Sequence, residues 1–155
     1  MSDQNARAAF MAGGCACGKT RFAITAAPIV THACHCHMCQ RRSGSAFAVN
    51  AMIETDRVVL LDGELAPDED GVRCATCRQS LWGHHPACGP GIAIFPIGLM
   101  DDAERLAPDV HCFTGSKHPW IDLPRDVPAF AENYEMAVLS DAAMARFAAT
   151  QAVAS

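Results

Sequence analysis

Hydrophobic and polar residues alternate in short stretches along most of this chain. In residues 20–26, Phe22 and Ile24 alternate with their neighbours in a pattern typical of a half-buried β-strand. Further strands are predicted at residues 28–34, 45–53, 56–63, 79–85, 91–100 and 109–115. Residues 63–72 contain proline, glycine and several acidic residues, and they predict a loop. The pattern therefore indicates a mainly β protein with many turns.

A helical pattern replaces this alternation near the C-terminus. Met144, Phe147 and Ala148 recur at helical spacing, and Ser140 or Asp141 can cap the first turn. These positions predict a C-terminal helix at about residues 140–153. We expect its Met144 and Phe147 face to lie in the core or in a homodimer contact.

The length and composition fit a single globular domain. The chain has 155 residues, of which 50% are hydrophobic and 19% are charged, so it can bury a core and is not disordered. We expect a polar leader at residues 1–11, a β domain at residues 12–130 and a C-terminal extension at residues 131–155.

The charge and the N-terminal sequence bear on partners and location. A net charge of -5 argues against broad nucleic-acid binding, which favours a basic face. No stretch is apolar enough for a transmembrane helix, and the N-terminus lacks the apolar region of a secretion signal. We therefore expect no membrane partner and a cytoplasmic location. In that reducing compartment, the nine cysteines are better explained as metal ligands or reactive thiols than as disulfides.

Two cysteine pairs far apart in the sequence suggest one metal site. Cys15 and Cys17 have C-x-C spacing, and Cys74 and Cys77 have C-x-x-C spacing, each beside a predicted strand. Two such pairs together supply the four thiolates of a closed, tetrahedral structural zinc site. A thioredoxin-like dithiol at Cys74 and Cys77 is the alternative, but the βαβ context of that motif is missing.

A second set, Cys34, Cys36 and Cys39, has no obvious fourth ligand. Its C-x-C-x-x-C spacing lets three thiolates converge on one metal from a single loop. An open fourth position is typical of a catalytic zinc, whereas a fourth protein ligand makes the site structural. The residues that can supply this fourth ligand are His32, His35, His37, Cys88 and Cys112.

The charge of an open site favours thiol chemistry over hydrolysis. Zn²⁺ with three thiolates has a formal charge of -1 and is a weaker Lewis acid than zinc held by neutral histidines. It can still bind a substrate thiol and present it, deprotonated, to an electrophile. Arg41 and Arg42 follow the set and can pair with carboxylates of an anionic thiol, or be solvated, or lie at a helix end. Residues 41–44 can also form the first turn of a short helix whose amides face an anion.

Other residues carry weaker signals. Lys117 is a candidate for holding an anionic substrate, and Trp120 either lines a pocket or packs at a core edge. Cys112 lies in an alternating strand and can be a small buried hydrophobic residue. Its use with Cys88 in a redox or metal sensor is a further alternative.

Two polar pairs complete the candidates. His84 and His85 lie beside Cys88, where they can act as metal ligands or as an acid–base pair, or simply be exposed. Asp101 and Asp102 follow a predicted strand, and we expect them to form a turn or a cap.

Five segments together resemble the family of glutathione-dependent formaldehyde-activating enzymes and its centromere-protein-V-like relatives. They are GGCACGKTRF, CHCHMCQRRSG, RCATCRQSL, GLMDD and KHPWIDLP, and they extend from about residue 12 to residue 130. The spacing of the cysteines makes this resemblance specific. One departure is Arg78, because the family usually has glycine after the second cysteine of its C-x-x-C pair. We expect the backbone of this turn to differ, since arginine resists a positive φ.

The resemblance implies a fold, two metal sites and an activity. The fold is a single Mss4-like β domain stapled by zinc, with short helices and a C-terminal helix. Two Zn²⁺ ions per chain are implied, one structural and one catalytic or exchangeable at Cys34, Cys36 and Cys39. The activity is the addition of glutathione, or a similar small thiol, to formaldehyde or a related aldehyde, which is a carbon–sulfur lyase reaction when written backwards. The alternative is a non-catalytic zinc-binding interaction module with two structural sites.

Overall fold

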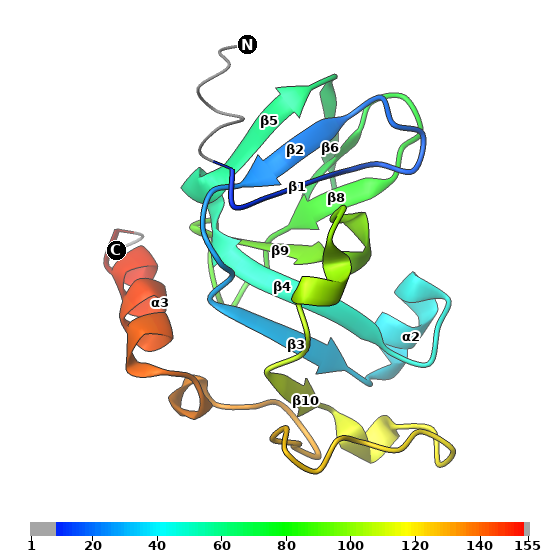
Figure 1. The fold of residues 1–155 in the computed structure, drawn as a ribbon, viewed down its shortest axis with the longest axis vertical. Coiled ribbons are helices and arrows are strands. Elements are labelled where there is room, and N and C mark those ends of the chain that lie inside the picture. Colours follow the sequence, from blue (N-terminus) through cyan, green and yellow to red (C-terminus); the bar gives the residue numbers. More distant parts are fainter. Residues whose placement is uncertain (1–8, 154–155) are drawn as a thin grey trace.

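The computed structural model describes residues 9–153 and contains two β-sheets (Figure 1). The three-stranded antiparallel sheet has the order β1 (Met11–Gly14), β2 (Arg21–Ile24) and β5 (Val58–Asp62). The seven-stranded sheet has the order β10 (Val110–Cys112), β3 (Val30–Cys34), β4 (Ala48–Glu54), β9 (Ile92–Pro96), β8 (Ser80–Gly83), β7 (Gly71–Cys74) and β6 (Leu65–Asp68). Its neighbouring strands are antiparallel except β10 and β3, which are parallel.

Two α-helices and several short turns complete the described residues. The helices are α2 (His37–Ser43) and α3 (Asp141–Val153). Single 3-10 turns lie at Thr55–Arg57, Ile97–Leu99, Ala103–Arg105, Thr114–Ser116 and Met136–Val138. The predicted mainly β class with a C-terminal helix is confirmed. Neither helix within residues 9–153 has the length and hydrophobicity needed to cross a membrane.

The main core lies between the two sheets. Phe22 of β2 is fully buried, and its ring lies 5.4 Å from that of Trp82 and 6.4 Å from that of Phe95. Ala51 and Ile53 of β4 face this core, while Met52 between them faces the other side of the sheet. This arrangement follows from strand geometry, because successive side chains of a strand point to opposite faces.

The C-terminal extension covers the second face of the seven-stranded sheet. Phe130, Tyr134, Leu139 and Phe147 pack there against Val30, Met52, Ile92 and Val110. Because both faces of β9 are covered, its hydrophobic run is nearly continuous instead of alternating. The hydroxyl of Ser140 accepts from the amide of Ala143 at 3.2 Å, as an N-cap does. Met144, predicted to share a buried face with Phe147, is 39% exposed.

Two predictions from the sequence need correction. Residues 63–72 do not form a simple loop. Strands β6 (Leu65–Asp68) and β7 (Gly71–Cys74) pair there as an antiparallel hairpin. Acidic residues are compatible with this hairpin because Asp68 forms an ion pair with Arg73 across it. In addition, β1 begins one residue before the predicted domain boundary, and Met11 is buried in the core. Residues 1–8 of the predicted leader lie outside the described residues, and the division of the chain into three parts otherwise stays a prediction.

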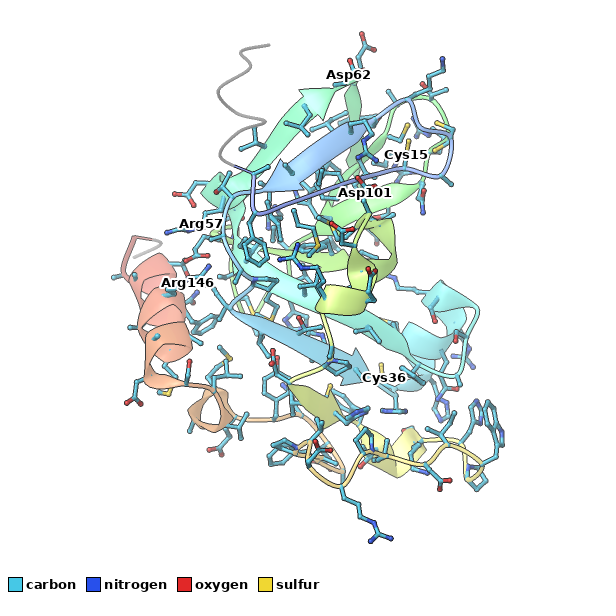
Figure 2. All side chains as sticks on the ribbon, in the orientation of Figure 1. Cys15, Cys36, Arg57, Asp62, Asp101 and Arg146 are labelled. Atoms are coloured by element: carbon cyan, nitrogen blue, oxygen red, sulfur yellow. The ribbon has the colours of Figure 1, made fainter. Side chains whose placement is uncertain are left out.

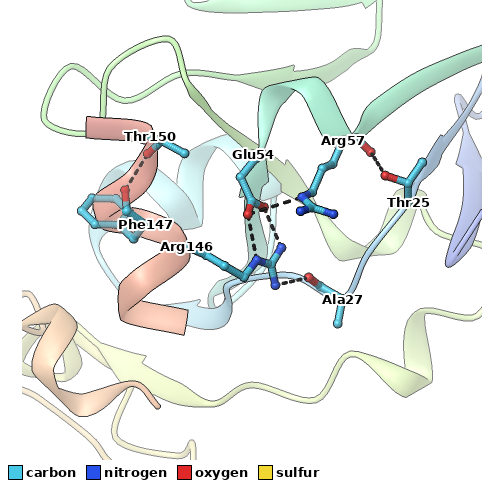
Figure 3. Close-up of polar contacts among 7 residues, drawn as sticks. All are labelled: Thr25, Ala27, Glu54, Arg57, Arg146, Phe147 and Thr150. Carbon is cyan, nitrogen blue, oxygen red and sulfur yellow. Dashed lines mark hydrogen bonds and ion pairs between the residues drawn. The ribbon is translucent and has the colours of Figure 1, made fainter. Parts of the chain in front are cut away.

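An ion pair fastens α3 to the end of β4 (Figure 3). The carboxylate of Glu54 accepts from Nε of Arg146 at 2.7 Å and from Nη2 at 2.6 Å. Nη1 of Arg146 also donates to the carbonyl of Ala27 at 2.9 Å. Burial alone would raise the pKa of Glu54, but the hydrogen bonds and charge of Arg146, with the charge of Arg57, lower it below its ordinary 4.5.

We expect Arg146→Ala to destabilise the protein by about 2 kcal/mol, between the values for exposed and fully buried ion pairs. The substitution leaves the nearly buried Glu54 carboxylate without its main partner. Chemical denaturation at neutral pH measures the loss. Arg57→Ala is the matched control, because Arg57 lies 3.4 Å from the same carboxylate and its side chain is 44% exposed. Its loss should stay below about 1 kcal/mol.

The lowered pKa of Glu54 also predicts how the stability difference between wild type and Arg146→Ala changes with pH. The pKa of Glu54 is lower in the folded than in the unfolded protein, so the pair stabilises fully above the unfolded value of about 4.3. This stabilisation is lost as the pH falls through the folded pKa. The gap between wild type and Arg146→Ala should therefore narrow below about pH 4. A gap that does not change with pH would contradict the assignment.

Candidate metal centres

The first cysteine set joins the two sheets. Cys15 follows β1 of the small sheet, and Cys74 ends β7 of the large sheet. The Sγ atoms of Cys15, Cys17, Cys74 and Cys77 all lie within 4.8 Å of one another. Cys15 and Cys74 are buried, whereas Cys17 and Cys77 are exposed. Four convergent thiols are the donor set of a closed tetrahedral zinc site, and zinc fits this set.

Neighbouring donors favour the thiolate form in this set. The hydroxyl of Thr20 donates to Sγ of Cys74 at 3.1 Å, and the amide of Cys77 reaches the same sulfur at 3.5 Å. These two hydrogen bonds are the main reason that the pKa of Cys74 is lowered to about 5. The amide of Thr20 likewise donates to Sγ of Cys15 at 3.3 Å. Such contacts orient and hold metal-binding thiolates.

In both turns that carry the cysteine pairs, the residue after the last cysteine has a positive φ. Gly18 follows Cys17 with a φ of 74°, and Arg78 follows Cys77 with a φ of 65°. The amide of Gly18 donates to the carbonyl of Cys15, and that of Arg78 to the carbonyl of Cys74, both at 3.0 Å. The expectation that arginine changes this backbone is therefore wrong. Residue 78 has the left-handed backbone conformation, which is unfavourable for arginine.

We expect Arg78→Gly to stabilise the protein by about 0.5–1 kcal/mol, because glycine lacks the Cβ that makes the left-handed region unfavourable. Urea denaturation of the zinc-loaded protein measures the gain. Gly18→Ala is the reciprocal control: an added Cβ meets nothing within 4 Å, so any loss of stability comes from the φ of 74° alone. If both substitutions shift stability in the same direction, backbone strain does not explain them.

The second set lies where β3 meets α2. Cys34 ends β3, Cys36 is the N-cap residue of α2, and Cys39 lies in its first turn. The amide of Cys39 donates to Sγ of Cys36 at 3.4 Å. The three Sγ atoms lie within 4.8 Å of one another, and no further His, Cys, Asp or Glu of residues 9–153 joins them. Figure 2 places Cys36 beside the end of β3, in a different part of the molecule from Cys15. This set therefore has three protein donors.

The histidines near this set have other partners. His35 is fully buried, and its Nε2 lies 3.0 Å from Nδ1 of His111. Its ring also lies 4.9 Å from that of Phe47, and its Nδ1 has no hydrogen-bond partner. Nδ1 of His32 lies 3.1 Å from the hydroxyl of Tyr134. His35 is thus held by His111, whose side chain points to the opposite face of β10 from Cys112, the register partner of Cys34.

The two remaining cysteines differ in their surroundings. Cys112 is 2% exposed and lies opposite Cys34 in the register of β10 and β3. Cys88 packs against the second core and is not part of either set. The neighbouring thiol of Cys112, followed by that of Cys39, lowers the pKa of Cys34. Cys34 in turn raises the pKa of Cys39 and of Cys112. Among these neighbouring thiols, the surroundings therefore favour the thiolate form at Cys34.

A mostly apolar cavity of about 590 Å³ is lined by Phe47, His111 and Trp120, among other residues, and by no cysteine of the second set. Phe47 and His111 both contact His35, which lies between Cys34 and Cys36 in the sequence. The cavity wall is therefore in contact with His35. His111 was not among the residues singled out from the sequence, although its position next to Cys112 in an alternating strand was a signal.

The basic residues predicted to bind substrate lie in two places, in helix α2 and directly after the 3-10 turn Thr114–Ser116. Arg41 and Arg42 are exposed in the last turn of α2, so the expectation that residues 41–44 begin a helix is wrong. α2 starts earlier because Cys36 caps it, and basic residues in a last turn interact favourably with the helix dipole. Nζ of Lys117 donates to the carbonyls of His118 and Ile121, at 3.1 and 2.6 Å.

Lys117 thereby shapes the loop that carries Trp120. The Trp120 ring is stacked on that of His118, with centroids 5.4 Å apart, and its residue is 71% exposed. Of the two roles expected for Trp120, the structure favours the pocket wall. The two other polar pairs lie elsewhere: Nδ1 of His84 bonds the carbonyl of Ile92 at 2.7 Å, and Asp101 forms an ion pair with Arg21.

A mainly β domain with two clusters of convergent thiols defines a protein that can bind metal ions through cysteine. The chain belongs to the family of glutathione-dependent formaldehyde-activating enzymes, whose family model matches residues 10–116. No curated protein matches the chain. Among solved structures, a Rhodobacter sphaeroides protein is 18% identical, with 77% of this chain and 99% of that chain covered and a TM-score of 0.46.

The two sets should respond differently to substitution. We expect two zinc ions per wild-type chain, measured by metal analysis of the purified protein. Cys74→Ser removes a buried ligand that links the sheets, so this variant should lose its cooperative unfolding transition. Cys36→Ser should lose one zinc and stay folded, because Cys36 is partly exposed at a helix end. If Cys36→Ser unfolds as completely as Cys74→Ser, the second site is structural.

Proposed function

We propose that this chain is a zinc-dependent enzyme that adds glutathione, or a similar small thiol, to formaldehyde or a related aldehyde. In reverse, the same reaction is a carbon–sulfur lyase reaction. One observation carries the proposal: three sulfurs converge at Cys34, Cys36 and Cys39 with no fourth protein donor among residues 9–153. Membership of the formaldehyde-activating family supports the choice of substrates.

The donor set of the second site fits zinc. Three thiols within 4.8 Å match the ligand number of a catalytic site with one free position. Zinc bound there supplies a positive centre that keeps a substrate thiol deprotonated at neutral pH. Since the three cysteines are themselves anionic as ligands, the site suits a soft thiolate better than a water-derived nucleophile.

The chain's own residues position the reactants. Cys34, Cys36 and Cys39, which would hold the metal, are positioned by the end of β3 and the first turn of α2. The substrate sulfur attacks the aldehyde carbon, a carbon–sulfur bond forms, and the aldehyde oxygen takes up a proton. Arg41 and Arg42, exposed at the end of the same helix, attract the carboxylates of glutathione. The cavity wall at Trp120 offers an apolar surface to the rest of the thiol.

A non-catalytic interaction module requires a closed second site. None of the candidate histidines His32, His35 and His37 joins the three sulfurs. His35 pairs with His111, His32 bonds Tyr134, and His37 is exposed. This observation favours the enzyme over the module. We further propose that the chain works in the cytoplasm, where thiols stay reduced.

The activity test uses zinc-loaded protein, glutathione and ¹³C-formaldehyde. NMR exchange spectroscopy measures the rate at which formaldehyde and its hydroxymethyl adduct interconvert. We expect wild type to accelerate this exchange and Cys36→Ser to lose the acceleration, because a ligand of the open site is missing. Cys88→Ser is the matched control and should keep wild-type activity, since Cys88 belongs to neither set.

Two results would count against the proposal. Wild-type protein with two zinc ions and no acceleration for any small thiol or aldehyde would favour the interaction module. X-ray absorption gives an independent reading, because an open site changes its sulfur shell when a thiol is added. A shell that stays constant would show that the second site is closed.

A further inference from the structure

A cysteine outside the second set lies directly opposite its first member. β10 runs parallel to β3 in a register that pairs Cys112 with Cys34. Paired residues of neighbouring strands point to the same face of a sheet, and such strands lie about 4.8 Å apart. Both cysteines are buried, with exposed fractions of 6% for Cys34 and 2% for Cys112. The two thiols are therefore neighbours in the interior.

Cys112 lies beside the second set but is not a member of it. The sulfurs of Cys34, Cys36 and Cys39 lie within 4.8 Å of one another, and the sulfur of Cys112 is not part of that group. Its register partner is one particular member of the set, Cys34. A thiol beside a single ligand can form a disulfide with it, and the oxidised cysteine then no longer binds the metal as a thiolate.

The backbone geometry suits a disulfide between these two residues. Disulfides join residues whose Cα atoms lie about 4.4–6.8 Å apart, and the spacing of paired strands falls in this range. β10 is only three residues long and forms the edge of the sheet. β3 is its one neighbouring strand in this sheet, and on its other side His111 exchanges backbone hydrogen bonds with Pro128 and Phe130.

We propose that Cys34 and Cys112 form a disulfide when a peroxide oxidises the second set, and that this bond displaces the metal held there. The thiolate of Cys34 attacks a peroxide oxygen, giving a sulfenic acid and one water. The thiol of Cys112 then attacks that sulfur, so that the sulfur–sulfur bond forms and a second water leaves. Two thiols are oxidised, and one peroxide is reduced to two waters.

The first set lacks this arrangement. Its four sulfurs are all within the group, and Cys88, the remaining cysteine, packs in the second core. Peroxide should therefore release the metal of the second set and leave that of the first. The inference rests on metal binding at the second set, as in the proposed function, but not on the reaction with formaldehyde.

The test treats the zinc-loaded full chain with hydrogen peroxide. A colorimetric zinc indicator follows release, and mass spectrometry of unreduced peptides maps the disulfides. We expect one zinc released per chain, a link between the Cys34 and Cys112 peptides, and recovery of zinc binding after a thiol reductant. Mapping is repeated on zinc-free protein, so that a failure of zinc binding at the second set leaves the disulfide assignment testable.

Three variants make the result specific. Cys112→Val keeps an apolar side chain at this buried position and should lower reversible zinc release by about tenfold or more, with Cys34 oxidised beyond the sulfenic acid. Cys112→Ala is the second choice if valine does not fit, and Cys88→Ser should behave as wild type. A disulfide between Cys36 and Cys39, or unchanged reversible release in both Cys112 variants, would overturn the proposal.

Discussion

The convergence of four thiols at the ends of β1 and β7 is the constraint on which the arrangement of the two sheets depends. These strands belong to different sheets, and the main core fills the space between the sheets. Cys15 and Cys74 are buried where the strands end, with Thr20 donating to both sulfurs. Since buried thiolates need compensating charge, a metal bound by these four thiols would couple the position of one sheet to the other.

The second set uses the same ligand chemistry with a different geometry. One strand end and one helix turn supply three sulfurs, and the neighbouring residue that could close the site points the wrong way. His35 follows the last residue of β3, and its contacts with His111 and Phe47 hold it away from the three sulfurs. These two contacts therefore explain why His35 does not join the second set.

The C-terminal extension contributes more than a helix at the surface. The family model ends at residue 116, yet the following residues cover the sheet face that carries His32 and Cys34. Tyr134 bonds His32 from this extension, and Arg146 anchors α3 to Glu54. The surroundings of the second set thus depend in part on residues beyond the matched region.

The sequence by itself determined the chemistry of the sites, because ligands spaced within one turn are brought together by local geometry. The C-x-C and C-x-x-C pairs, the three clustered cysteines and the helix near residues 140–153 were all readable in this way. Only the tertiary structure decided the relations across the chain. It paired Cys112 with Cys34, turned His35 towards His111 and made residues 65–74 a hairpin, with Asp68 paired to Arg73. These relations depend on strand register and on which faces become buried, and neither is specified by the spacing of residues within one segment.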